Sequence, residues 1–127
     1  MTNRKGYKES ALIAVEAALE KKALEPVLID VSAESSYTDY ILIVSGRSDR
    51  QVQAISDGIL DACAARRVRP LGVEGVRDWV LLDFGGLVVH VFYHPVREFY
   101  DLEGLWIESP RVQLTVPPEA RAYEPVY

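Results

Sequence analysis

The chain has 127 residues and a mass of 14.2 kDa, the size of one domain that can bury a core without a disulfide or a metal. Apolar residues make up 49% of it and charged residues 26%, a balance that excludes global disorder. The formal net charge of −5 disfavours non-specific binding to nucleic acid or to an anionic membrane, because both need an excess of cations.

A helix and two strands are predicted at the start of the chain. The helix is expected over residues 8–22, because apolar residues recur there at helical spacing. Its apolar stripe comprises Leu12, Val15 and Leu19. Pro26 ends this pattern, and residues 26–31 are typical of a strand. Residues 39–44 (DYILIV) are apolar after the first position, which indicates a strand buried on both faces and therefore central in its sheet.

A second helix is predicted over residues 48–67. Ser48 stands three residues before Gln51, which is the spacing of a capping box. The expected buried stripe comprises Val52, Ile55, Ile59, Leu60 and Cys63. Cys63 is the single cysteine, so no internal disulfide exists, and we interpret it as a small core residue rather than a catalytic thiol.

Three strands and a helix are predicted next. The strands are expected over residues 69–73, 79–84 and 87–93. Gly85 and Gly86 separate the last two, and two glycines between β-rich runs indicate a tight hairpin. A final helix over residues 95–106 begins at Pro95, a residue that suits the first turn of a helix.

The predicted order of elements is αββαβββα, which indicates a mixed α/β or α+β domain with a single sheet of five strands. We expect this domain to span residues 1–106. Residues 107–127 contain four prolines, which break any helix, so we expect an extended or partly disordered tail. The N-terminus lacks the apolar core of a signal peptide, and no apolar run approaches the roughly 20 residues of a membrane span, so we expect a cytoplasmic protein.

The hairpin has two contrasting faces if Gly85 and Gly86 are its only loop residues. An aliphatic face suits the helices and carries Val80, Leu82, Phe84, Leu87, Val89, Val91 and Tyr93. The other face carries Trp79, Leu81, Asp83, Val88, His90 and Phe92. That mixture of aromatic rings, a carboxylate and an imidazole is more typical of a protein interface than of a core. It forms either a docking face or a second buried layer in which Asp83 or the backbone bonds His90.

The last helix is similarly ambiguous. Its expected core stripe is Val96, Phe99, Leu102 and Trp106. Arg97 and Tyr100 are three residues apart and therefore share one flank. They either extend a binding patch or belong to a solvated face.

Patterns typical of catalysis and metal binding are weak. His90 and His94 would lie roughly 13 Å apart on an extended strand, too far apart to share a metal. The segment SGRS, between a strand and a helix, resembles the entry to an anion site, because helix N-termini expose amide donors, and it would also suit a nucleotidyl-transfer fold. That chemistry needs paired carboxylates on the next strand to hold metal ions, and the sequence VRPLGV has none. We therefore interpret Ser48 as a helix cap and expect neither a metal nor a cofactor.

One local cluster of cations stands out in this acidic chain. It comprises Arg66, Arg67, Arg69 and Arg77. We favour a solvated helix end, where cations suit the helix dipole, over a basic patch that binds nucleic acid.

Four segments follow one another with consistent spacing: IDVSAESSYTDYILIVSGRSDRQVQAI, GVEG, DWVLLDFGGLVVHVF and REFYDLEGLW. Each motif alone is weak, but the four in register are highly specific. Together they resemble the ribosomal silencing factor family, also called the Iojap-like family. The resemblance covers residues 30–106 and leaves the tail outside.

The resemblance implies a nucleotidyltransferase-like fold without the catalytic acids, and a protein that is not an enzyme. Family members bind the large ribosomal subunit through ribosomal protein uL14. They thereby block joining of the small subunit and lower translation when nutrients are scarce. Many form homodimers when free. An acidic surface of this kind binds RNA poorly in general but can dock a basic ribosomal protein.

The family's motifs fall on Trp79, Asp83, His90, Arg97 and Tyr100 of this chain. Leu81 and Phe92 share the hairpin face with the first three and complete the predicted partner-binding set. A dimer through this face would compete with the ribosome. Two other functions remain open, namely a large-subunit assembly factor that uses the same surface and a divergent nucleotide-binding or nucleotidyltransferase enzyme.

Overall fold

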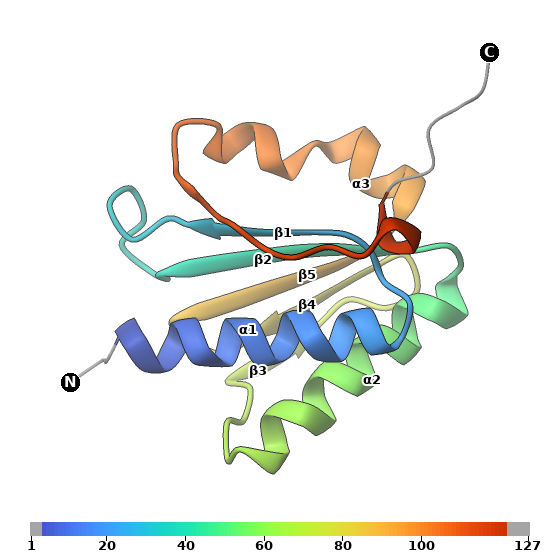
Figure 1. Ribbon diagram of the computed structural model, residues 1–127, viewed down its shortest axis with the longest axis horizontal. Helices are drawn as coiled ribbons and strands as arrows, with labels where there is room; N and C mark the ends of the chain where they lie inside the picture. The colour runs from blue at the N-terminus through green and yellow to red at the C-terminus, as the bar shows by residue number, and fades with distance from the viewer. Residues whose placement is uncertain (1–3, 122–127) are drawn as a thin grey trace.

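The computed structural model describes residues 4–121. Six strands in this range form a single mixed sheet. Its strand order is β3-β4-β5-β2-β1-β6 (Figure 1). The strands are β1 (Leu24–Asp30), β2 (Tyr40–Gly46), β3 (Gly72–Glu74), β4 (Trp79–Asp83), β5 (Leu87–Tyr93) and β6 (Arg111–Val112). Only β2 and β5 pair in parallel. The α+β class and the single mixed sheet are confirmed, with six strands rather than five.

The centre of the sheet is formed by β2 and β5. Every residue of β2 is buried, and β5 is buried up to Phe92. Near-continuous apolar sequence is what a strand with both faces covered requires, so the central position predicted for residues 39–44 is confirmed.

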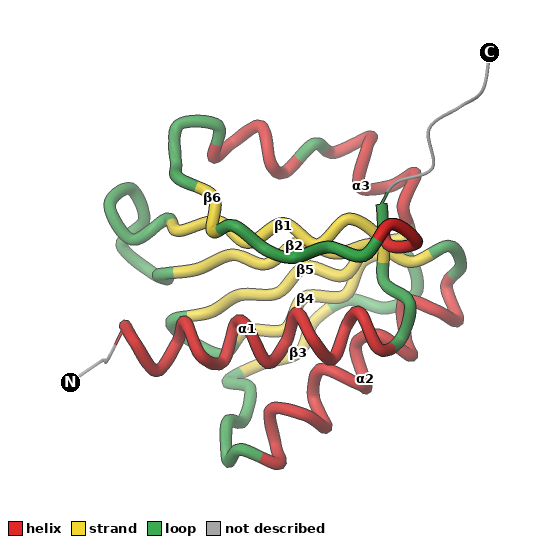
Figure 2. Tube along the Cα trace, viewed as in Figure 1, coloured by secondary structure: helices red, strands yellow, loops and turns green. Residues whose placement is uncertain are grey.

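Helices cover both faces of the sheet (Figures 1 and 2). The two long helices α1 (Arg4–Glu20) and α2 (Asp49–Ala65) pack together on one face. The short helix α3 (His94–Tyr100) and the 3-10 helix η1 (Leu102–Trp106) lie on the other. Because α3 and η1 are short, they cover only part of their face, and this leaves a surface beside them.

The face that α1 buries differs from the predicted stripe. Its fully buried side chains are those of Ala11, Ala14 and Ala18, whereas Leu12 is 41% exposed. Alanines let the helix approach α2 and the sheet closely, and the larger leucine is therefore turned outward. The placement of Leu12 in the core was wrong.

The cap of α2 follows the sequence prediction. The Ser48 hydroxyl accepts a hydrogen bond from the backbone N–H of Gln51 at 3.1 Å. The Gln51 side chain accepts from the backbone N–H of Arg47 and donates to the backbone oxygen of Lys22 at 2.9 Å. It thereby ties the start of α2 to the end of α1. Within the predicted stripe, Leu60 is only partly buried, and the other four residues are buried.

The predicted helix over residues 95–106 is interrupted. Helix α3 ends at Tyr100, and Asp101 adopts a left-handed conformation with φ of 45°. The backbone N–H of Asp101 closes the helix onto the oxygen of Arg97 at 2.9 Å. The chain continues as η1 in a new direction, so residues on either side of Asp101 do not share one helical face.

The C-terminal segment lies along the edge of the sheet. Val112 of β6 pairs with Leu28 of β1, and the backbone N–H of Asp30 donates to the oxygen of Pro110 at 2.9 Å. A short 3-10 turn, η2 (Pro118–Ala120), follows and buries Ala120. Residues 107–121 are therefore largely extended, with a sixth strand that the sequence did not predict. Residues 122–127 lie outside the described residues, and the division at residue 106 stays a prediction.

Candidate docking surface for a protein partner

The β4–β5 hairpin has the register that a two-residue turn requires. Its cross-strand pairs are Trp79–Phe92, Val80–Val91, Leu81–His90, Leu82–Val89 and Asp83–Val88. The backbone N–H of Phe84 donates to the oxygen of Leu87 across Gly85 and Gly86 at 2.8 Å. The assignment of side chains to two faces is therefore confirmed. The aliphatic face belongs to the main core beneath α1 and α2.

The face of the hairpin that carries Trp79 and His90 is buried on β5 and partly open on β4. Phe92 of β5 is fully buried in a second core cluster, and Val88 and His90 beside it are also buried. Apolar residues of α3 and η1 pack over this cluster: Val96, Leu102 and Trp106. On β4, in contrast, Trp79, Leu81 and Asp83 are only half-buried. The face is thus a second buried layer under α3 and an open surface along β4.

Trp79 is the centre of an aromatic cluster at the border between these two parts. Its ring centroid lies 4.7 Å from that of Phe92 and 4.9 Å from that of Tyr100. Its indole Nε1–H donates a hydrogen bond to Nδ1 of His90 at 3.1 Å. The half-buried indole is therefore held from three sides, which fixes its orientation toward solvent before any partner arrives.

His90 acts here as a hydrogen-bond acceptor. The sequence left open whether Asp83 or the backbone would bond it, and the structure shows Trp79 instead. Burial lowers the pKa of His90 to about 4 from its ordinary value of 6.5. The imidazole is thus neutral at pH 7, and its unprotonated Nδ1 can accept the indole proton.

Asp83 has a structural role in the hairpin turn. Its Oδ1 accepts a hydrogen bond from the backbone N–H of Gly85 at 2.8 Å. Gly85 adopts a φ of 91°, which the carboxylate helps to hold. Asp83 is nevertheless only half-buried.

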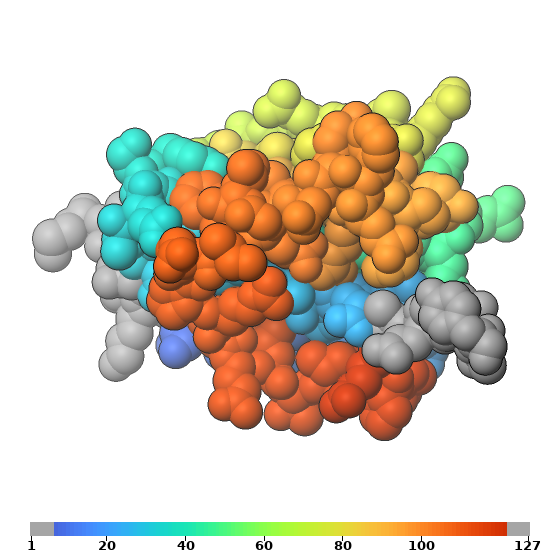
Figure 3. Space-filling view, turned by 90° about the horizontal axis from the view of Figure 1, so that it is seen from above, coloured from blue at the N-terminus to red at the C-terminus, as the bar shows by residue number. Residues whose placement is uncertain are grey.

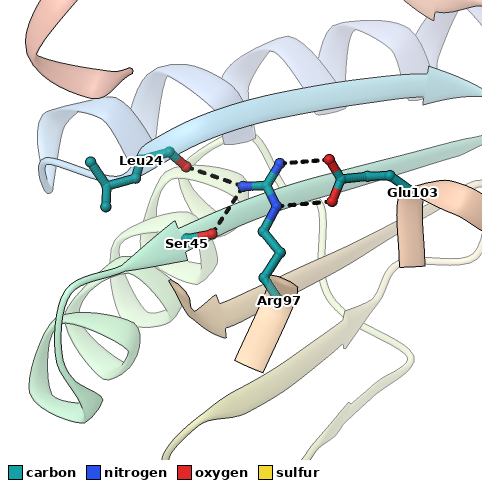
Figure 4. Close-up of polar contacts among 4 residues, drawn as sticks. All are labelled: Leu24, Ser45, Arg97 and Glu103. Atoms are coloured by element: carbon teal, nitrogen blue, oxygen red, sulfur yellow. Dashed lines mark hydrogen bonds and ion pairs between the residues drawn. The ribbon is translucent and has the colours of Figure 1, made fainter. Parts of the chain in front are cut away.

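Arg97 is a buried anchor for α3 (Figure 4). Its Nε and Nη2 donate to the two carboxylate oxygens of Glu103 at 3.0 and 3.1 Å. Its Nη1 donates to the hydroxyl of Ser45 at 2.9 Å and, over 3.5 Å, to the backbone oxygen of Leu24. The guanidinium thus joins α3 and η1 to the ends of two strands. Arg97 is only 4% exposed, so the expectation that it lies beside Tyr100 on an exposed flank of the helix was wrong.

Phe99 and Tyr100 provide the apolar surface on α3. Phe99, expected in the core, is 80% exposed, and Tyr100 is 55% exposed. Their rings meet edge-on, with centroids 5.1 Å apart, and Tyr100 also contacts Trp79. The three rings therefore form one continuous strip. The predicted core stripe assumed one continuous helix, and the break at Asp101 separates Phe99 from Leu102 and Trp106, which pack on the core from η1.

Glu74 adds a carboxylate that the sequence did not single out. It is exposed on β3, directly across from Leu81 of β4. Cross-strand partners share a face, so Glu74 lies beside the open part of the hairpin. We call the set Glu74, Trp79, Leu81, Asp83, Phe99 and Tyr100 the docking surface. Figure 3 shows α3 and η1 in orange, with the yellow and yellow-green β3–β4 region along the edge beyond them.

Other features of the described residues concern metal, thiol and ligand chemistry. Within residues 4–121, no group of three His, Cys, Asp or Glu side chains could hold a metal ion. Burial raises the pKa of the Cys63 thiol, which favours its neutral form. No helix in this range has the length and apolarity needed to cross a bilayer. A cleft of about 860 Å³ beside α3 is open and lined mainly by charged side chains, unlike the apolar pockets typical of small ligands.

Comparison with known proteins connects this arrangement to one family. The sequence model described as "Ribosomal silencing factor during starvation" matches residues 4–125. A Bacillus subtilis protein named ribosomal silencing factor RsfS is 39% identical over 104 residues, which are 80% of this chain and 88% of that protein. A mouse protein named "Mitochondrial assembly of ribosomal large subunit protein 1" is 34% identical over 92 residues, which are 68% of this chain and 40% of that protein.

Two solved structures share the fold. A crystal structure of a protein from Chromobacterium violaceum superposes with a TM-score of 0.77 at 31% identity, covering 87% of this chain and 92% of that one. A crystal structure of a protein from Bacillus halodurans gives a TM-score of 0.75 at 37% identity, covering 84% of this chain and 99% of that one. The likeness therefore extends over most of the fold described above.

Proposed function

This chain belongs to the ribosomal silencing factor family, and from that premise we propose that it binds the large ribosomal subunit and blocks its association with the small subunit. The partner that we propose on the large subunit is ribosomal protein uL14. The effect is repression of translation under nutrient limitation, in keeping with the starvation named in the family description. The proposed location is the cytoplasm, where ribosomes work.

The docking surface is the observation that carries this proposal. Phe99, Tyr100 and Trp79 offer a strip of aromatic rings, the residue types that most often anchor protein interfaces. Glu74 and Asp83 add carboxylates on the same face of the β3–β4 pair as Trp79. A basic protein such as a ribosomal protein complements this combination, since the carboxylates favour the encounter and the rings supply contact area.

The proposed action is steric and not catalytic. The chain needs only to occupy the surface that the small subunit would meet. The buried residues of the predicted set then have supporting roles: His90 fixes the indole of Trp79, Phe92 supports its ring, and Arg97 anchors α3. We therefore narrow the proposed partner contacts to the docking surface, because Phe92 and Arg97 present almost no surface. A surface held in place beforehand loses little conformational entropy on binding.

We further propose that the free protein forms a homodimer through the docking surface. Exposed aromatic rings on an otherwise charged protein favour self-association. One surface cannot serve two partners at once, so the dimer must dissociate before the ribosome is bound. Raising the protein concentration would then increase the fraction of protein in dimers without a proportional increase in the fraction of large subunits bound.

Co-sedimentation with purified large subunits tests the docking surface. Phe99→Ser removes an exposed ring from it, and Leu12→Ser is the matched control, because Leu12 is an exposed apolar residue on α1, across the sheet. Wild type and Leu12→Ser should co-sediment equally, and Phe99→Ser should bind at least tenfold more weakly. Equal binding by both variants would contradict the proposed surface. No co-sedimentation of the wild type at micromolar concentrations would contradict the function.

A role in assembly of the large subunit is the second candidate, favoured by the name of the mouse relative. The two roles differ in the substrate on which the protein acts. A silencing factor reduces joining of mature, purified subunits. An assembly factor that uses the same surface can also obstruct joining, so the distinguishing result is that its depletion from cells causes incomplete large subunits to accumulate.

A further inference from the structure

Four arginines lie along the β3 edge of this acidic protein. Residues 66–78 contain only two carboxylates, Glu74 and Asp78, although the whole chain carries a net charge of −5. All four arginine side chains are exposed. We call them the arginine edge: Arg66, Arg67, Arg69 and Arg77. This segment is therefore positively charged, whereas the rest of the molecule is negatively charged.

The arginine edge borders the docking surface at both ends of β4. At one end, two residues after Arg69, the backbone N–H of Leu71 donates to the oxygen of Asp83 at 2.6 Å. At the other end, Arg77 stands two residues before Trp79. In Figure 3 the yellow-green residues of this segment form the rim beyond β4. A partner that covers the docking surface would therefore bring its neighbouring groups close to Arg69 and Arg77, and Arg66 and Arg67 precede this segment at the end of α2.

Within residues 4–121, the four arginines have no bonded partner. Among the described residues, no hydrogen bond or ion pair uses any of the four guanidinium groups, whereas the guanidinium of Arg97 donates four hydrogen bonds. Exposed charges without a partner contribute little to the stability of the fold. An anionic partner would satisfy all four.

We propose that the arginine edge binds phosphate groups of ribosomal RNA next to the docked protein partner. This proposal rests on the proposed function, because it takes the large subunit as the binding platform. A guanidinium group matches a phosphate with two parallel hydrogen bonds. The acidic remainder of the chain disfavours RNA elsewhere, so these contacts form only where the docking surface has already placed the edge.

The salt dependence of binding provides the test, since each phosphate contact releases counterions. Arg67 has a φ of 62° at the end of α2, so Arg67→Gly removes the cation and keeps the backbone favourable. Lys22→Gly is the matched control. Lys22 has a φ of 66° at the end of α1, with the same pair of hydrogen bonds closing the helix. Both variants should melt at or above the wild-type temperature.

The affinity for large subunits is measured from 50 to 200 mM salt for the wild type and both variants. We expect Arg67→Gly to reduce the slope of log Kd against log salt by about 0.7–0.9, a roughly threefold smaller change over this range. Adding Arg66→Ser and Arg69→Ser should reduce it further. Lys22→Gly should keep the wild-type slope. Equal slopes in Arg67→Gly and Lys22→Gly would overturn the proposal while leaving the proposed function intact.

Hydroxyl-radical footprinting of the RNA identifies the partner. Wild type should protect a short RNA segment that Arg67→Gly with Arg66→Ser leaves open. If the slope falls but no RNA is protected, the edge contacts an acidic protein and the RNA proposal is wrong. If the wild type does not bind large subunits at all, the proposed function fails, which is a result distinct from either of these.

Discussion

Replacing Arg97 by alanine should destabilise the protein by about 3 kcal/mol. The change removes a buried guanidinium that bonds both oxygens of Glu103 and the hydroxyl of Ser45. Breaking a buried pair by deleting one partner costs about 3–5 kcal/mol. The lower part of that range applies, because the Glu103 side chain is 20% exposed and can regain some water. The free energy of unfolding of a domain is typically about 5–15 kcal/mol, so the variant should still fold.

Urea denaturation of four proteins measures this effect: wild type, Arg97→Ala, Glu103→Ala and the double variant. The double variant should lose less stability than the sum of the two single losses, because no unpaired buried charge remains in it. Arg111→Ala, which removes an exposed cation from β6, should change stability by less than about 0.5 kcal/mol. If Arg97→Ala stays within about 0.5 kcal/mol of wild type, or if the two single losses simply add, Arg97 is not the anchor described here.

Three further outcomes follow from the hairpin and its surroundings. The pKa of His90 is about 4 in the folded protein and near 6.5 when unfolded, so the unfolded state binds more protons between these values. The contribution of His90 to the free energy of unfolding should therefore be fully present above pH 6.5, and about 3 kcal/mol of it should be lost as the pH decreases to 4. In urea titrations, His90→Asn should lack this pH dependence. An unchanged pH dependence in that variant would refute the assignment. Phe99→Ser should change stability by less than about 0.5 kcal/mol, since the ring is 80% exposed; a larger loss in the same titrations would place that ring in the core. Gly75→Ala should cost about 2 kcal/mol or more, because Gly75 has a φ of 82° and an added Cβ would lie 2.1 Å from the backbone oxygen of Trp79; a wild-type melting temperature would contradict this.

The hairpin shows what the sequence predicts well. Gly85 and Gly86 define a two-residue turn, and the turn then sets every cross-strand pair and the face of every side chain. Both faces of the hairpin could therefore be assigned before the structure was known. What the sequence could not decide was how far the short helix α3 covers one of them, since coverage depends on tertiary packing.

The last helix shows where prediction from spacing fails. Regular spacing placed Phe99 in the core and Arg97 on the solvent side, and the structure reverses both. The reason is local: Asp101 turns the chain after two turns of helix, and Glu103 then meets Arg97 from η1. A buried ion pair between two elements leaves no periodic signal, so only the assembled fold reveals it.

The most direct test of the central claim is the joining of purified ribosomal subunits with increasing amounts of this protein. The wild type should reduce the fraction of joined ribosomes in proportion to its occupancy of the large subunit. Tyr100→Ala, which removes a half-exposed ring of the docking surface, should need at least tenfold more protein for the same effect. Normal joining with the large subunit fully occupied by wild type would contradict the account, because a bound protein that does not obstruct the small subunit cannot act by steric exclusion.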